Sequence, residues 1–421
     1  MDVRKLTLLT ITIVLTACQQ KKSVDPVANY KNGVQAQTCP ADRMIKNRFI
    51  VKYTDGRVGL IEAENEALFE KDFLEPHLDE VKRVEYDSIV TLVEPNADAT
   101  SPEAPQDWGP KAIHADSVWA EGIYGQGVIV AVVDTAVDLS HPQIAPRILV
   151  NTVEQNGVGG QDDDQNGYVD DVYGWDFIAK APPSPITSDQ VYHGTHVAGI
   201  IAADPTQGGF SGVAPQAQIL PASFIDPDHG SVGAAIQAMN YAVSRGARII
   251  NASWGGRDCS ETLKDTIISI GQGEKGVLFV AASGNDGYDY DRLGPASYQY
   301  PAVFNVANLL SVAATDVLDN LTAFSNRSYD FVHLGAPGAS IYSTVPRAAN
   351  ASGYAYLDGT SMAAPFVSGA AALLWSAKPS ATVTQIRQAL LNSTDFHSYK
   401  VATQGRLNVQ KALSEIRRIV P

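Results

Sequence analysis

Three residues, widely separated along the chain, are of the types that nucleophilic catalysis needs. Asp134 follows an apolar run at 128–133, His193 opens the segment His-Gly-Thr-His-Val-Ala-Gly, and Ser361 lies in Gly-Thr-Ser-Met-Ala-Ala-Pro. A serine hydroxyl becomes a strong nucleophile when an imidazole takes its proton, and a carboxylate can hold that imidazole in the correct tautomer. The chain order Asp, His, Ser is one in which such triads occur. We therefore predict acyl transfer by these three residues.

Each segment alone has a second interpretation. Asp134 could cap a turn or end a nucleotide-binding strand, but the nearby glycines, at 122, 125 and 127, precede the strand, whereas a phosphate loop follows it. His193 and His196 could bind a metal ion, but the zinc-protease pattern spaces its histidines at i and i+4 with a Glu between them. A serine before a helix is most often only a cap.

Pro365 indicates where the serine lies. Proline is tolerated in the first turn of a helix, so we expect Ser361 close to a helix N-terminus. The free backbone N–H groups and the helix dipole at such a terminus favour a developing oxyanion.

Together, the segments at 132–135, 193–199 and 359–365 resemble the signature motifs of the subtilisin-like serine proteases. The resemblance extends over about 108–415, with Ala136 departing from the glycine that is usual after the Asp-Thr pair. It implies a serine endopeptidase that acts on polypeptides. In the same family, the segment Ala-Ala-Ser-Gly-Asn resembles the oxyanion-hole segment, so the side chain of Asn285 is expected to stabilise the tetrahedral intermediate.

A substrate-binding edge is implied by the same resemblance. Ser253, Trp254 and Gly255 resemble the segment that pairs with an extended peptide. Asp286 follows the oxyanion residue and could favour a basic side chain before the cut bond, although a general excess of surface acid explains it equally well.

An acidic loop at 162–171 has the composition of a calcium site. Several of its residues match positions of an EF-hand loop, but position 12 is Tyr173 instead of the bidentate Glu, so the match is partial. We expect a structural calcium ion and no organic cofactor; a solvated acidic loop is the alternative. The expected ligands are Asp162, Asp164, Asn166, Tyr168 (through its carbonyl), Asp170 and Asp171.

The fold expected around these residues is α/β: a parallel sheet covered by helices on both faces, as in the subtilisin-like family. Continuous apolar runs separated by helical segments favour that architecture. Active sites of such sheets form at the carboxyl ends of the strands. The expected strands are 128–133, 218–222, 249–252, 277–281 and 309–313, and helices are expected at 231–245 and 260–270.

The N-terminal part is expected to carry export and maturation signals. Residues 1–17 resemble a lipoprotein signal peptide, and Cys18 the lipidated residue of a bacterial lipobox. The chain would then be anchored to a membrane of the bacterial envelope, the outer membrane where there is one, or be secreted after maturation. We expect a tether at 18–44, a small α+β unit at 45–95 that resembles the family's inhibitor-like propeptide, a linker at 96–107 and the catalytic domain at 108–421. Self-cleavage is expected within 94–107; a permanent accessory domain is the alternative to the propeptide.

Composition excludes other classes. The formal net charge is −15, which argues against nucleic acid as a partner. No apolar run reaches about 18 residues, so no transmembrane helix is expected. The three cysteines are too few for a disulfide framework, although Cys39 and Cys259 could pair after export or remain free thiols. We expect a monomer.

Overall fold

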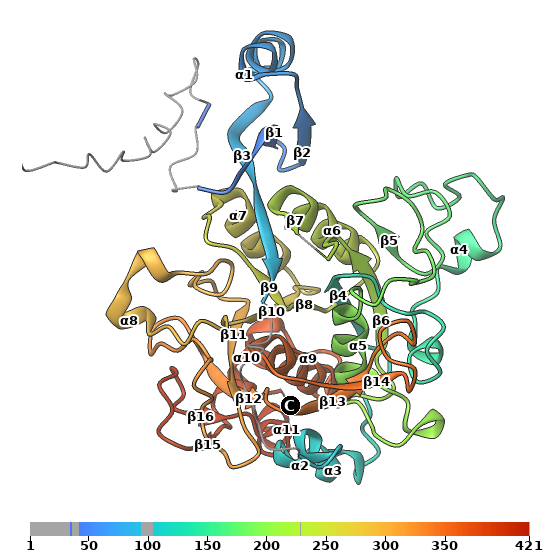
Figure 1. The fold of residues 1–421 in the computed structure, drawn as a ribbon, viewed down its shortest axis with the longest axis vertical. Helices are drawn as coiled ribbons and strands as arrows, with labels where there is room; N and C mark the ends of the chain where they lie inside the picture. Colours follow the sequence, from blue (N-terminus) through green and yellow to red (C-terminus); the bar gives the residue numbers. More distant parts are fainter. Residues whose placement is uncertain (1–33, 36–41, 94–103, 228, 421) are drawn as a thin grey trace, which may run out of the picture.

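The computed structural model describes residues 34–35, 42–93, 104–227 and 229–420 (Figure 1). Its larger unit is built on a nine-stranded sheet whose neighbouring strands run parallel, apart from the antiparallel pair at one edge. In spatial order the strands are β15 (Asp395–Phe396), β16 (Gly405–Arg406), β12 (Leu334–Pro337), β11 (Leu309–Thr315), β10 (Leu278–Ala282), β8 (Ile249–Ala252), β4 (Ile129–Asp134), β6 (Gln218–Ser223) and β5 (Trp175–Asp176).

Helices cover both faces of this sheet, as expected. Along β4, Val130 and Val132 belong to one buried cluster, and Ala131 and Val133 belong to another, because successive side chains of a strand point to opposite faces. The first cluster contains α9 (Thr360–Ala377), α5 (His193–Ala202), α10 (Val383–Leu391) and α11 (Val409–Ile419); the second contains α6 (Val232–Ser244) and α7 (Glu261–Ile270).

A smaller unit lies at the N-terminal end of the described chain. Its strands β1 (Met44–Tyr53), β2 (Val58–Glu62) and β3 (Val81–Leu92) pair antiparallel. Between β2 and β3 the chain forms three consecutive short turns, α1 (Glu66–Leu68), the π-helical η2 (Phe69–Leu74) and η3 (Glu75–His77). The unit has its own small core, which includes Phe49, Val51, Phe69, Leu74, Val81 and Val84.

Strand β3 joins the two units. It continues beyond the small sheet and pairs with β7 (Gly230–Ser231) and β9 (Trp254–Gly255) of the larger unit. Figure 1 shows β3 running down from the small unit towards β9, with α7 on one side and α6 on the other.

The remaining described elements are short. They are α2 (Trp108–Ala112), α3 (Ala115–Trp119), α4 (Thr152–Gln155), α8 (Tyr290–Leu293), η4 (Ala145–Arg147), η5 (Pro205–Gln207), η6 (Pro295–Ser297), and the hairpin of β13 (Ile341–Thr344) and β14 (Tyr354–Leu357). No helix among the described residues has the length and apolar character needed to cross a membrane.

Candidate active site

The three predicted catalytic residues come from three different elements and are all buried. Asp134 is the last residue of β4, His193 the first residue of α5, and Ser361 the second residue of α9. The Nδ1 atom of His193 lies 2.7 Å from Oδ1 of Asp134. A carboxylate in this position holds the imidazole with its proton on Nδ1, which leaves Nε2 as the base.

The hydroxyl of Ser361 faces a backbone carbonyl of the small unit. Its Oγ atom donates to the carbonyl oxygen of Val93 at 2.9 Å and lies 3.0 Å from the carbonyl oxygen of Ser253. Asn285 Nδ2 donates to the same Val93 oxygen at 3.1 Å. The Asn285 amide is oriented by Thr360, whose N–H and Oγ1 both donate to Oδ1 at 2.9 Å. The predicted nucleophile and the predicted oxyanion donor therefore meet at one peptide carbonyl.

Pro365 lies deeper in its helix than the sequence analysis expected. Helix α9 begins at Thr360, so the proline is in the second turn instead of the first. Because proline has no N–H, the carbonyl oxygen of Ser361, four residues earlier, receives no helical hydrogen bond from it. The hydroxyl of Ser253 donates to that oxygen at 2.8 Å instead, while Asn251 Nδ2 donates to Ser253 Oγ at 2.9 Å.

His196, the other histidine of the motif, has a different environment. Its Nε2 atom lies 3.1 Å from the carbonyl oxygen of Ile341 and 3.2 Å from that of Ala355. Complete burial lowers the pKa of His196 to about 3, so the ring is neutral at physiological pH. The ring thus connects α5 to the β13–β14 hairpin.

The predicted substrate edge is paired with the small unit. In the antiparallel register of β3 and β9, Leu92 faces Trp254 and Thr91 faces Gly255, and Val93 N–H lies 3.4 Å from the carbonyl oxygen of Ser253. Residues 89–93 therefore add a strand to the larger unit, as an extended peptide does in strand-addition binding.

Beside Val93 lies a cavity of about 280 Å³, lined by Gly255, Arg257, Asp286 and Gln299 among others. The carboxylate of Asp286 accepts a 2.5 Å hydrogen bond from Gln299 Nε2 and lies 3.7 Å from the guanidinium of Arg257. A cation already accompanies this carboxylate, which weakens the expectation that it selects basic side chains.

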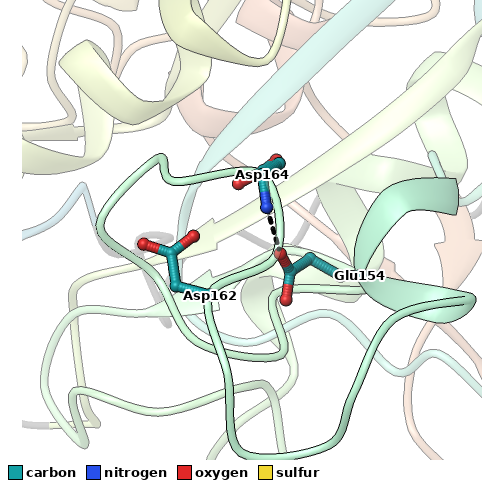
Figure 2. Close-up of side chains that lie close together, drawn as sticks. All are labelled: Glu154, Asp162 and Asp164. Carbon is teal, nitrogen blue, oxygen red and sulfur yellow. Dashed lines mark hydrogen bonds between the residues drawn. The ribbon is translucent and has the colours of Figure 1, made fainter.

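Three carboxylates converge at the acidic loop, two from the loop itself and one from α4. Oxygen atoms of Glu154, Asp162 and Asp164 lie within 4.8 Å of one another, and among the described residues no salt bridge reaches any of them. Figure 2 shows the three side chains, with Glu154 accepting from the backbone N–H of Asp164. Such a set of hard oxygen donors fits calcium. The sequence analysis did not include Glu154, which lies in α4 outside the loop and carries no motif signal.

The other predicted ligands are held in different ways. Asp171 is buried, with Oδ2 in an ion pair with Arg245 at 2.6 Å and in a hydrogen bond from Tyr241 at 2.7 Å. Asp170 Oδ2 accepts from the Gly160 N–H at 2.8 Å. Asn166 Nδ2 donates to both Asp164 and Asp171, and the ring of Tyr168 packs on Trp175 and Phe177.

Comparison with known proteins adds sequence and fold relatives. Residues 125–414 match the model of the peptidase S8 subtilase family. The chain is 38% identical to the major intracellular serine protease of Bacillus subtilis, over 64% of this chain and 74% of that protein. It is 35% identical to subtilisin BL of Lederbergia lenta, over 72% of this chain and 97% of that protein. The crystal structure of fervidolysin from Fervidobacterium pennivorans, a keratinolytic enzyme, superposes with a TM-score of 0.71 at 25% identity; it covers 88% of this chain, which spans 61% of the fervidolysin chain.

Proposed function

The chain belongs to the subtilase family of serine endopeptidases, and we propose that it is a precursor that cuts its own chain between Val93 and Glu94. One observation carries the proposal: the carbonyl oxygen of Val93 lies 2.9 Å from Ser361 Oγ and 3.1 Å from Asn285 Nδ2. The proposed bond lies at the N-terminal border of the 94–107 stretch, of which 94–103 lie outside the described residues.

We propose the following chemistry for this arrangement. Ser361 Oγ attacks the carbonyl carbon of Val93 while His193 takes the hydroxyl proton. Negative charge develops on the Val93 oxygen, where Asn285 donates. His193 then returns the proton to the leaving nitrogen of Glu94, and water hydrolyses the ester between Val93 and Ser361. Other polypeptides then use the same edge of β9.

We propose that residues 42–93 act as the enzyme's own inhibitor after the cut. Their contacts do not depend on the cut bond: Glu85 Oε1 accepts from the Thr262 N–H at the start of α7 at 2.9 Å, and Asp87 Oδ1 accepts from the Gly233 N–H in the first turn of α6 at 2.8 Å. Each carboxylate satisfies a helix N–H that has no partner within its own helix. The cut fragment would thus stay in the cleft and compete with substrates.

Ion pairs extend this contact. Asp265 of α7 lies 2.7 Å from Lys52 Nζ and 2.9 Å from Arg83 of β3. Arg83 also lies 3.4 Å from Glu261. Basic side chains of the small unit therefore meet acidic side chains of the larger one, which favours their association.

Calcium and the membrane anchor belong to the same proposal. We propose that calcium binds at Glu154, Asp162 and Asp164 and stabilises the folded state without entering the reaction; the convergence of these carboxylates supports it. We propose lipidation at Cys18 and a location in the bacterial envelope, or secretion after maturation. These rest on the sequence alone, because Cys18 lies outside the described residues.

The test of self-cleavage uses Ser361→Ala, with the exposed Ser352→Ala as the matched control. We expect the first variant, expressed alone, to remain a full-length precursor and the second to mature normally. N-terminal sequencing of the larger mature fragment, separated under reducing conditions, should begin at Glu94. Processing of Ser361→Ala in the absence of other proteases, or a mature N-terminus elsewhere, would contradict the proposal.

A further inference from the structure

Cys259 is disulfide-bonded. It lies in the turn just before α7, on the side of the larger unit that contacts β3. The chain has two other cysteines, Cys18 and Cys39, and both lie outside the described residues. The partner of Cys259 within this chain is therefore one of these two.

The neighbouring Asp258 indicates which one. Its carboxylate accepts the backbone N–H of Asp42 at 2.7 Å and the backbone N–H of Arg43 at 2.7 Å. This buried carboxylate thus holds the backbone of Asp42 beside the turn that contains Cys259. Asp42 comes three residues after Cys39 in the sequence. Three residues span at most about 10 Å, and a disulfide requires Cα atoms about 4.4–6.8 Å apart. Cys39 is therefore within reach, whereas Cys18 requires closure of a longer loop at a higher entropic cost.

We propose that Cys39 and Cys259 form a disulfide that keeps the N-terminal unit covalently attached to the protease. Its consequence for maturation rests on the proposed cut at Val93–Glu94; the bond itself does not. The two thiols lose two protons and two electrons to a disulfide-bearing oxidant of the exporting compartment, which is reduced to a dithiol. The sulfur atoms are then joined across the contact that Asp258 makes.

The bond changes what the cut achieves. Cleavage after Val93 converts the protein into two chains that remain one molecule. The fragment that contains β3 can leave β9, but it rebinds at an effective concentration in the ~mM range that dilution does not change. Release of the inhibitor then requires reduction of the disulfide or proteolysis of the fragment. An N-terminal lipid would also continue to hold the mature protease at the membrane.

The first experiment tests the bond without any cleavage. The Ser361→Ala precursor is alkylated without reductant, digested with trypsin and analysed by mass spectrometry. We expect one cross-linked peptide pair containing Cys39 and Cys259, which disappears on reduction. Alkylated Cys39 and Cys259, or a pair joining Cys18 to Cys259, would overturn the proposal whether or not the protein cuts itself.

The second experiment tests retention in the matured enzyme. On a denaturing gel without reductant, wild-type protein should run as one species, and reductant should separate the two fragments. Cys39→Ser should separate without reductant, whereas Cys18→Ser, the control, loses the proposed lipid but should still separate only with reductant. On dilution, Cys39→Ser should gain activity at least tenfold faster than wild type. Separation of wild-type fragments without reductant would overturn retention. A single uncut chain in every lane, reduced or not, would instead contradict the cut at Val93 and leave the decision on the bond to the peptide map.

Discussion

The hydroxyl of Ser253 donates a 2.8 Å hydrogen bond to the backbone carbonyl oxygen of Ser361, the oxygen that Pro365 leaves without a helical donor. Ser253, whose own carbonyl oxygen accepts from the Val93 N–H at the predicted substrate edge, thus also holds the backbone of the predicted nucleophile. A chain of side chains supports it, because Asn251 Nδ2 donates to Ser253 Oγ and Ser368 Oγ donates to Asn251 Oδ1.

Ser253→Ala should lower kcat more than it raises KM. The substitution leaves the buried carbonyl oxygen of Ser361 without a donor, which costs about 1–3 kcal/mol. Pro365→Ala restores a backbone N–H at the position that can donate to this oxygen. The double variant should therefore lose less than the sum of the two single losses in steady-state kinetics, and strict additivity would show that the two residues do not share this oxygen.

Asn285→Ala should reduce kcat by about 10²–10³-fold, the usual effect of removing one oxyanion donor. KM for a peptide substrate should change little, because the amide contributes most when charge develops on the carbonyl oxygen. The exposed Asn350→Ala is the matched control. If kcat/KM fell by the same factor because KM rose while kcat stayed constant, Asn285 would instead contribute to ground-state binding.

His193→Ala should abolish turnover, whereas His196→Ala should mainly lower stability. His193 lies against Asp134 at 2.7 Å, and its loss should abolish turnover. His196 has a pKa of about 3 because it is buried, so its ring stays neutral at physiological pH. His196→Ala should lower the melting temperature but retain turnover with an unchanged pH–rate profile. A shifted profile in folded protein would place His196 in the proton-transfer pathway.

Sequence motifs and the hydrophobic pattern predicted the features that depend on residues close together in the chain. The strand expected at 249–252 coincides with β8, because a buried parallel strand is a continuous apolar run. The contact of Val93 with Ser361 joins positions 268 residues apart, and that of Ser253 with Ser361 spans 108, so neither follows from local spacing. Glu154 was missed for a different reason: it is close to Asp162 in the sequence, but it lies in the separate helix α4 and carries no motif signal.

Calcium should raise the melting temperature of the wild-type protein relative to a chelator-treated sample. Ligand at 100 times its Kd stabilises a folded state by about 2.7 kcal/mol. Glu154→Gln removes one of the converging carboxylates and should lose most of this shift, whereas Glu274→Gln, an exposed control with the same charge change, should keep it. Identical melting of the wild-type protein with and without calcium would contradict the site.

Asp171→Asn tests whether Asp171 supports the fold through its ion pair or binds calcium. Because buried Asp171 is ion-paired with Arg245, its neutralisation should destabilise the protein by a similar amount with and without calcium. Loss confined to the calcium-containing sample would make Asp171 a ligand, as the sequence analysis expected.

Rising pH should weaken the hold of the small unit on the protease through Glu85. Burial raises the pKa of the Glu85 carboxyl above its ordinary value of 4.5, even though hydrogen bonds from Ser260 and Thr262 act in the opposite direction. In the released fragment this side chain is exposed and returns to its ordinary pKa. The bound state therefore takes up a proton more readily than the separated parts. Its contribution to association is fully present below pH 4.5 and is lost as the pH rises through the raised pKa.

Asp265 has the opposite sign in a more acidic range. Its burial raises the pKa, but Lys52 and Arg83 outweigh that effect and lower it below the ordinary 3.8, so its contribution is lost only as the pH falls. The difference between wild type and Glu85→Gln isolates Glu85. The measurement is the Kd of the cut fragment on matured enzyme, under reducing conditions, from pH 4 to 8. Wild type should show a Kd that rises by up to tenfold per pH unit, the limit for one proton. Glu85→Gln should flatten this rise, and the exposed control Glu80→Gln should keep it. An unchanged slope in Glu85→Gln would assign the pH dependence to another group.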